Sequence, residues 1–375
     1  MTIVPLGLPE VRSGLEGVPA LLPDSPKQTK KTFTSDAEAR WCPGCGDYAI
    51  LAAVQGFLPE LGLRRENIVC ISGIGCSSRF PYYLDTYGLH SIHGRAPSIA
   101  TGLATSRPDL NVWVVTGDGD ALSIGGNHLI HALRRNVNIT ILLFNNRIYG
   151  LTKGQYSPTS EPGKVTKSTP VGSVDEPFNP VSLALGAEAT FVARTMDSDR
   201  KHLTSVLRQA VEHRGAALVE IYQNCPIFND GAFDVLKDRD EAQGRLIPLE
   251  HGAPIRFGAP AADGLGSRGV ARRADGLLEV VELPAGAASP DASRVLVHDT
   301  RTVDPSVQFA LSRLDDPSMT HVPVGVFRAV SRPAYDDMVR AQVDSAIEGA
   351  HGPATDDDLT RLLAGSDTWT VPEPA

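Results

Sequence analysis

A βαβ unit between residues 111 and 144 constrains the fold of this chain more than any other segment. Residues 111–116 (NVWVVT) and 139–144 (ITILLF) are apolar, β-branched runs typical of buried strands. Between them, Gly-Asp-Gly-Asp at 117–120 predicts a turn, and residues 122–135 have helical spacing. Because strands joined by a helix pair in parallel, we expect an α/β fold with a mainly parallel sheet flanked by helices.

The segments on either side of the βαβ unit also alternate between predicted helices and predicted strands. Before the unit, the pattern predicts helices at 47–58 and 97–106 and a strand at 68–71. After it, residues 151–180 are rich in Gly, Pro, Ser and Thr, which is typical of a lid or binding loop. The pattern then predicts, in chain order, a helix at 180–185, a strand at 190–193, a helix at 199–213 and a strand at 216–222.

Changes in composition divide the chain into three parts. Residues 1–31 are rich in Pro, Gly and Leu without steady periodicity and are expected to form an N-terminal arm. Residues 32–225 hold the regular α/β pattern. Residues 226–375 begin with a loop-rich stretch and are expected to be a C-terminal extension that packs on the first domain, with a strand at 295–298 and helices near 304–314, 334–348 and 356–363.

The bulk composition excludes several classes of protein. Of the 375 residues, 42% are hydrophobic, which is enough to bury a core. A formal net charge of −9 argues against a nucleic-acid binder and against a protein of anionic membranes. No run approaches the ~20 apolar residues of a membrane span. The N-terminus lacks the basic start of a signal peptide, so we expect a cytoplasmic location, where cysteines more often bind metals than form disulfides.

Polar residues follow both strands of the βαβ unit. Gly117-Asp118-Gly119, 25 intervening residues and Asn145-Asn146 have the spacing of the thiamine-diphosphate motif. Its Mg²⁺ prefers oxygen ligands at about 2.1 Å, including phosphate oxygens. The Asp118 carboxylate, the Asn146 amide and the Ile148 carbonyl are suitable donors. The alternative is a tight turn and a polar strand end, but the position at the carboxyl edge of a parallel sheet favours a cofactor site.

Four of the five cysteines form a second candidate site. They lie in the segments WCPGCG (Cys42 and Cys45), GIGCSS (Cys76) and NCP (Cys225). A [4Fe–4S] cluster needs four thiolates, often a Cys-x-x-Cys pair with distant partners. A structural zinc ion and a redox dithiol are open alternatives on spacing alone. The cofactor motif between the cysteines favours a cluster, which accepts single electrons. Cys70 lies within a strand and is expected to be a small buried apolar residue.

Six segments in order and spacing resemble the β subunits of 2-oxoacid:ferredoxin oxidoreductases, most closely the 2-oxoglutarate type. They are WCPGCGDYAIL, SGIGCSSR, HGRAPSIATGLA, VTGDGDALSIGGNHLIHALRRN, LLFNNRIYGLTKGQ and QNCPIFN. The resemblance covers about residues 32–235 and is less distinct toward the C-terminus. It implies a thiamine-diphosphate-binding fold.

The resemblance also implies roles for individual residues. Cys42, Cys45, Cys76 and Cys225 would ligate one [4Fe–4S] cluster, and Asp118, Asn146 and the Ile148 carbonyl would bind Mg²⁺. The remaining cofactor contacts would be Gly75, Ser77, His93, Gly117, Gly119 and Asp120. Arg79 and His93 are the candidate catalytic residues, since a cation beside the cofactor suits a dicarboxylate substrate. The alternatives are an ion-pair partner for Arg79 and a hydrogen-bonded pocket residue for His93. Lys153 is a candidate for substrate or phosphate contact or a solvated loop residue.

The implied activity is coenzyme A-dependent oxidative decarboxylation of 2-oxoglutarate to succinyl-CoA and CO₂. Electrons would pass through the cluster to ferredoxin, docked near the Cys42–Cys45 loop. The chain carries no matching glutamate motif for the aminopyrimidine ring, so an α subunit in an α₂β₂ enzyme would supply that group. Three alternatives stay open: pyruvate or another 2-oxo acid as substrate, a non-oxidative thiamine-diphosphate decarboxylase with a structural metal site, and a non-catalytic iron–sulfur subunit.

Overall fold

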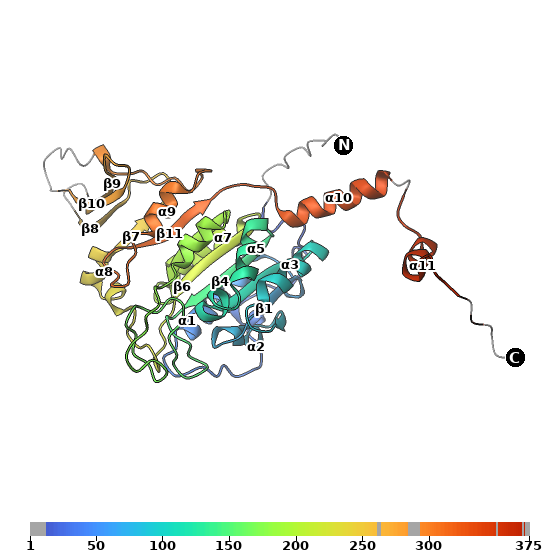
Figure 1. The fold of residues 1–375 in the computed structure, drawn as a ribbon, viewed down its shortest axis with the longest axis horizontal. Helices are drawn as coiled ribbons and strands as arrows, with labels where there is room; N and C mark the ends of the chain where they lie inside the picture. Colours follow the sequence, from blue (N-terminus) through green and yellow to red (C-terminus); the bar gives the residue numbers. More distant parts are fainter. Residues whose placement is uncertain (1–12, 261–263, 284–292, 350–351, 370, 372–375) are drawn as a thin grey trace.

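The computed structural model describes residues 13–260, 264–283, 293–349, 352–369 and 371 (Figure 1). The first twelve residues of the predicted N-terminal arm lie outside the described residues. Within the described parts, eight strands form one sheet in the order β2–β1–β3–β4–β6–β5–β11–β7. These strands are β1 Ile68–Ser72, β2 Tyr87–His90, β3 Asn111–Gly117, β4 Ile139–Asn145, β5 Phe191–Met196, β6 Ala216–Tyr222, β7 Leu246–Leu249 and β11 Val322–Ala329.

All pairs in this sheet are parallel except β5 with β11, which confirms the predicted mainly parallel sheet. Strand β3 shows why the sheet needs cover on both sides. Val112 and Val114 belong to one apolar core, whereas Trp113 and Val115 belong to the other. Because successive side chains of a strand point to opposite faces, a strand that is apolar throughout must be buried on both faces.

Helices cover both faces, so the fold has three layers (Figure 1). One face packs on α3 (Ala96–Ser106), α5 (Gly126–Arg135), α6 (Pro180–Gly186) and α9 (Ser306–Ser312). The other packs on α1 (Asp47–Phe57) and α7 (Arg200–Glu212). The remaining helices are α2 Phe80–Tyr83, α4 Asp118–Leu122, α8 Arg239–Arg245, α10 Tyr335–Gly349 and α11 Asp356–Ala364. No helix among the described residues has the length and apolar character that crossing a membrane requires.

The structure corrects the prediction for residues 117–135. The Gly-Asp-Gly-Asp segment is not a free turn: Gly117 precedes helix α4, which begins at Asp118. The single helix predicted at 122–135 is interrupted, and α5 begins only at Gly126. The reason is a close backbone crossing, since a Cβ on Gly125 would lie 2.9 Å from the Cα of Gly94. Only a residue without a side chain permits such an approach.

The C-terminal segment contributes more to the main sheet than the sequence predicted. Strands β7 and β11 extend the sheet of the first domain, so the sheet continues across the predicted boundary at residue 225. Within the described residues, β8 (Arg256–Pro260), β9 (Gly266–Arg272) and β10 (Leu278–Glu282) form a separate antiparallel sheet. The strand predicted at 295–298 makes isolated bridges through Val295 and Val297 instead.

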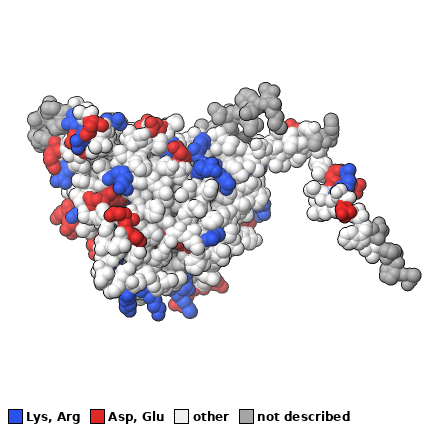
Figure 2. Space-filling model, viewed as in Figure 1, with Lys and Arg blue, Asp and Glu red and all other residues white. Residues whose placement is uncertain are grey.

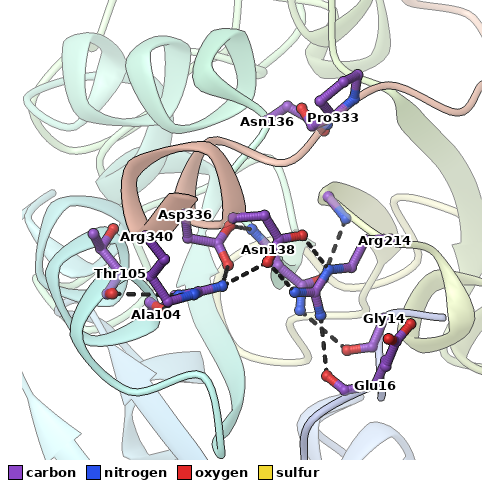
Figure 3. Close-up of polar contacts among 12 residues, drawn as sticks. Gly14, Glu16, Ala104, Thr105, Asn136, Asn138, Arg214, Pro333, Asp336 and Arg340 are labelled. Atoms are coloured by element: carbon purple, nitrogen blue, oxygen red, sulfur yellow. Dashed lines mark hydrogen bonds and ion pairs between the residues drawn. The ribbon is translucent and has the colours of Figure 1, made fainter. Parts of the chain in front are cut away.

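Helix α10 is held to the body at its first turns by a cluster of charged groups (Figure 3). Arg340 Nη1 donates to the carbonyl oxygens of Ala104 and Thr105, and its Nη2 lies 2.8 Å from Asp336 and 2.6 Å from Asp337. Arg214 pairs with the same Asp337 carboxylate. Burial raises the pKa of Asp337, but its bonds to the two arginines outweigh this effect and lower the pKa below its usual range.

Replacing Arg340 therefore tests how α10 is fixed. The Arg340→Met variant should lower the free energy of unfolding by about 1.5–3 kcal/mol, because it removes hydrogen bonds to charged groups that are shielded from water. The matched control is Arg361→Met, whose ion pair with Asp358 on α11 is exposed and should contribute less than about 1 kcal/mol. Urea unfolding followed by circular dichroism gives both values, and equal effects would contradict the anchoring role.

Candidate functional site

A cavity of about 430 Å³ opens at the carboxyl ends of β1, β3 and β4. The loop after β1, the start of α4 and the loop after β4 form its walls. All nine residues predicted to contact the cofactor line this cavity, namely Gly75, Ser77, His93, Gly117, Asp118, Gly119, Asp120, Asn146 and Ile148. Parallel strands place their carboxyl ends at one edge of a sheet, which explains why segments far apart in sequence meet here.

Asp118 is buried at the floor of the cavity, and hydroxyl groups from the long loop hold its carboxylate. Ser157 donates a hydrogen bond to Asp118 Oδ2, and Thr159 Oγ1 lies 2.7 Å from the same oxygen. Thr159 Oγ1 also lies 2.9 Å from Asn145 Oδ1, at the end of β4. Burial raises the pKa of Asp118, and the two hydroxyl hydrogen bonds act against that rise. The predicted loop at 151–180 thus packs against the cavity through its hydroxyl groups.

Asn146 is oriented by its neighbours. Its Nδ2 donates to Gln223 Oε1 at 2.9 Å, and its Oδ1 accepts a hydrogen bond from the Ile148 backbone nitrogen at 3.1 Å. The Asp118 carboxylate, the Asn146 amide oxygen and the Ile148 carbonyl, all from residues on the cavity wall, form a set of oxygen donors. Oxygen donors of this kind suit Mg²⁺.

Asp120 joins three segments of the wall. Its Oδ1 accepts hydrogen bonds from the backbone nitrogens of Ile74 at 3.2 Å and Gly94 at 2.8 Å, and its Oδ2 accepts from the Thr116 hydroxyl at 2.8 Å. A Cβ on Gly73 would lie 1.8 Å from Asp120 Oδ2. Glycine at position 73 is therefore needed for this carboxylate to reach across to both loops.

The four predicted ligand cysteines gather beside the cavity, and Cys76 also lines it. A Cβ on Gly150 would lie 3.4 Å from the sulfur of Cys76 and 3.7 Å from that of Cys225, so both sulfurs face one small space. Burial, with help from the neighbouring Asp47 carboxylate, raises the pKa of Cys76 to about 12 and the pKa of Cys45 further. Neighbouring thiols add to this rise in pKa, because Cys42 and Cys225 lie close to Cys76, and Cys76 and Cys225 lie close to Cys45.

Among the described residues, no three His, Cys, Asp or Glu side chains lie close enough to hold a single metal ion. Cys70 is buried in β1, as the sequence predicted.

Of the three residues that the sequence suggested for substrate contact, His93 lines the cavity, whereas Arg79 and Lys153 do not. His93 lines the cavity and is exposed, and its carbonyl accepts a hydrogen bond from Arg95. Arg79 does not line the cavity in the described structure; its guanidinium carbon lies 5.9 Å from the ring centre of Tyr83. Lys153 is exposed, with a positive φ of 77°. Its neighbours Thr152 and Gln155 line the cavity, but Lys153 does not.

Sequence reasoning missed the residues that orient the predicted ligands. Ser157 and Thr159 hold Asp118, Gln223 orients Asn146, and the Tyr149 hydroxyl donates to the Gly119 carbonyl at 3.1 Å. The hydroxyl-rich run at 157–160 within the long loop was the available signal, but spacing alone does not connect it with Asp118. Trp41, in the first cysteine segment, donates from Nε1 to the Cys76 carbonyl at 2.7 Å and so joins the two cysteine loops.

Comparison with known proteins agrees with this geometry. Residues 73–221 match the family model of the thiamine pyrophosphate enzyme C-terminal TPP-binding domain. The 2-oxoglutarate oxidoreductase subunit KorB of Mycobacterium tuberculosis is 64% identical over 366 residues, which cover 98% of this chain and 94% of that protein. The 2-oxoacid:ferredoxin oxidoreductase subunit beta of a Sulfolobus species is 47% identical over 51% of this chain and 63% of its own length.

A solved structure shows the same fold. The 2-oxoglutarate:ferredoxin oxidoreductase of Magnetococcus marinus, with 2-oxoglutarate, coenzyme A and succinyl-CoA bound, matches with a TM-score of 0.70 and 33% identity. The match covers 93% of this chain and 99% of that one. Together with the near full-length identity to the mycobacterial subunit, these findings show that the chain belongs to the family of 2-oxoacid:ferredoxin oxidoreductase β subunits that includes the 2-oxoglutarate oxidoreductase subunit KorB.

Proposed function

We propose that this chain is the β subunit of an α₂β₂ 2-oxoglutarate:ferredoxin oxidoreductase that holds thiamine diphosphate, Mg²⁺ and one [4Fe–4S] cluster. The observation that carries the proposal is the position of Cys76, which belongs both to the cavity wall and to the group of four thiols. A cofactor in the cavity would therefore lie beside the electron acceptor, and electrons would have a short path out of the site.

The cavity supplies what a diphosphate and its metal ion require. Asp118, Asn146 and the Ile148 carbonyl would hold Mg²⁺, while Gly117 and Gly119 let the backbone approach the phosphates. A Cβ on Gly119 would collide with the Tyr149 ring at 2.1 Å, so this backbone has no room for a side chain. Thiamine diphosphate, when bound, supplies the carbanion chemistry of decarboxylation.

The cysteine group supports a cluster through its donor set. Four thiolates are the ligands of a [4Fe–4S] cluster. Burial makes the thiols of Cys45 and Cys76 hard to ionise, with the pKa of Cys76 raised to about 12. Bound iron would offset that effect because a metal ion deprotonates its thiol ligands outright. We propose a cluster rather than a zinc ion or a dithiol, because the chain belongs to a family of ferredoxin oxidoreductase subunits.

The active site would be completed by the α subunit. Among the described residues that line the cavity there is no glutamate to pair with the aminopyrimidine ring. Ile124 and Leu151 form part of the cavity wall, yet more than half of each side chain is exposed. Apolar side chains at the mouth of a polar site suit burial against a partner subunit.

The substrate assignment rests on the relatives. The mycobacterial and Magnetococcus proteins are 2-oxoglutarate enzymes by name, and the latter was solved with 2-oxoglutarate and coenzyme A. The matches to archaeal relatives with the broader name 2-oxoacid:ferredoxin oxidoreductase cover about half of the length of this chain. We propose 2-oxoglutarate and coenzyme A as substrates, with His93 on the cavity wall and Arg79, which does not line the cavity, as the candidates for recognition of the carboxylates. The cytoplasmic location stays a prediction.

The two cofactor sites should be separable by mutation. Asp118→Ala in the co-purified αβ pair should lose bound thiamine diphosphate and Mg²⁺ but keep iron and sulfide. Cys42→Ser should lose iron and sulfide but keep thiamine diphosphate, and Cys70→Ala is the matched control because its side chain is buried in β1. Metal analysis and cofactor assay of anaerobically purified protein measure both. A Cys42→Ser enzyme with full iron content would overturn the cluster assignment.

Thr159 should act through Asp118. Thr159→Val keeps the shape of the side chain but removes the hydroxyl that lies 2.7 Å from Asp118 Oδ2. Loss of such an orienting hydrogen bond should weaken Mg²⁺ binding about 10–100-fold. Titration of Mg²⁺ into metal-free αβ enzyme, followed by the fluorescence change on thiamine-diphosphate binding, gives the affinity. Thr159→Ser, which keeps the hydroxyl, should retain most of the affinity, and an unchanged Mg²⁺ affinity in Thr159→Val would contradict the role of the hydroxyl.

The α subunit should be needed for turnover. The isolated chain should decarboxylate 2-oxoglutarate at least about 100-fold more slowly than the αβ pair, since no glutamate lines the cavity among the described residues. Release of CO₂ from carboxyl-labelled substrate measures both preparations at equal thiamine-diphosphate occupancy. Comparable rates would show that this chain contains a complete active site.

A further inference from the structure

The C-terminal end of the described chain leaves the body of the protein as an arm (Figure 1). We define the C-terminal arm as the described residues from 341 to 371. The base of α10 is fixed by Arg340, which bonds to α3 through Ala104 and Thr105 (Figure 3). From residue 342 to residue 349 every side chain of α10 is exposed, and no residue of α11 is buried. The arm is therefore anchored at one end and uncovered at the other.

The sequence of helix α11 is typical of a helix that packs an apolar face against another surface. Thr355 caps it with a hydrogen-bonded capping box shared with Asp358. Leu359, Leu362 and Leu363 follow at the spacing of one helical face, and their side chains are 52%, 79% and 78% exposed. Isolated helices shorter than about 12 residues are marginal in water, and most helical stability comes from packing an apolar face. α11 spans Asp356–Ala364 and so needs a surface to cover its leucines.

The charge of the arm indicates what kind of surface fits. Its described residues contain six acids, namely Asp344, Glu348, Asp356, Asp357, Asp358 and Asp367, and one base, Arg361. Figure 2 shows both signs of charge on α11, where Arg361 pairs with Asp358. The remaining acids have no basic neighbour along the arm. A complementary surface therefore needs an apolar floor and a basic rim.

Such a surface exists on the same chain, between α5, α6 and α9. A groove of about 410 Å³ is lined by Ile130, Leu183, Phe178, Phe309 and other side chains, with Arg313 on its wall. Phe178 and Phe309 are both exposed. Arg134 follows Ile130 by one helical turn and is also exposed, which places it on the same side of α5. Figure 2 shows Lys and Arg side chains gathered where α5 meets the base of α10.

Three acids lie close to the groove, and one of them is in an ion pair. Glu188, two residues beyond the end of α6, pairs with Arg328 at 3.3 Å. Asp316, near Arg313, accepts hydrogen bonds from Ser318 and keeps its charge, and Glu176 is exposed. Arg134 and Arg313 form no ion pair among the described residues, so both can pair with the acids of α11.

We propose that α11 docks in the α5–α6–α9 groove of a second copy of this chain. The arm does not reach its own groove, because α10 carries α11 away from the body (Figure 1). Since each copy has one arm and one groove, two copies exchange arms reciprocally and the contact closes with two-fold symmetry. A short amphipathic helix laid in an apolar groove is a recurring mode of protein recognition. This exchange would join two αβ units at their β subunits.

Site-specific photo-cross-linking in the αβ holoenzyme tests the proposal. Two β chains with different affinity tags are co-expressed with the α subunit, and one of them carries Leu362→Cys labelled with a benzophenone. We expect cross-links from position 362 to residues 126–135, 177–187 or 306–313 of the other-tagged β chain, identified by mass spectrometry. Leu22→Cys is the control because Leu22 is equally exposed but lies outside the arm. Cross-links to the α subunit or to the same β chain would overturn the proposal.

A groove variant distinguishes docking from chance proximity. Phe309→Asp in the acceptor chain should lower the cross-link yield about tenfold or more, because it places an acid in the apolar floor against an acidic helix. Val303→Asp changes a more exposed apolar residue outside the groove and should leave the yield unchanged. An unchanged yield with Phe309→Asp would contradict docking in this groove. Neither readout depends on turnover, so the result is independent of the proposed activity.

Discussion

The parallel pairing of β1, β3 and β4 is the constraint on which the rest of the site depends. It brings the ends of three strands to one edge, so that Cys76, Asp118 and Asn146 meet although they are far apart in sequence. The strands are apolar on both faces and must be covered by helices, which leaves the carboxyl edge as the place for polar loops. Asp120 then ties those loops together through Ile74 and Gly94.

The long loop after β4 makes this edge into a cavity. Its hydroxyl groups hold Asp118, its glycine at 150 leaves space for two cysteine sulfurs, and its apolar Leu151 stays exposed at the mouth. One segment therefore contacts Asp118, faces the thiol group and forms part of the surface where the α subunit is proposed to bind. The family of the chain, the cavity and the thiol group all agree with redox chemistry beside a thiamine cofactor.

The sequence predicted the βαβ unit well, and the residues that it proposed for the cofactor all line one cavity, because these signals are local. Apolar runs mark β3 and β4 within one residue of their ends, and the Gly-Asp-Gly and Asn-Asn motifs have fixed spacing. It missed β7 and β11 because their place in the sheet depends on pairing with strands distant in sequence. It missed Thr159 for the same reason, since 41 positions separate it from Asp118. The interruption before α5 depends on a backbone crossing at Gly94 that no local pattern shows.

Electron transfer by the anaerobically co-purified αβ pair tests the central claim most directly. Viologen reduction should be measured with a panel of 2-oxo acids, with and without coenzyme A, on protein whose iron and thiamine-diphosphate contents are known. The account predicts a brown enzyme that reduces viologen fastest with 2-oxoglutarate and only when coenzyme A is present. A colourless enzyme that releases CO₂ from a 2-oxo acid without reducing viologen would contradict it.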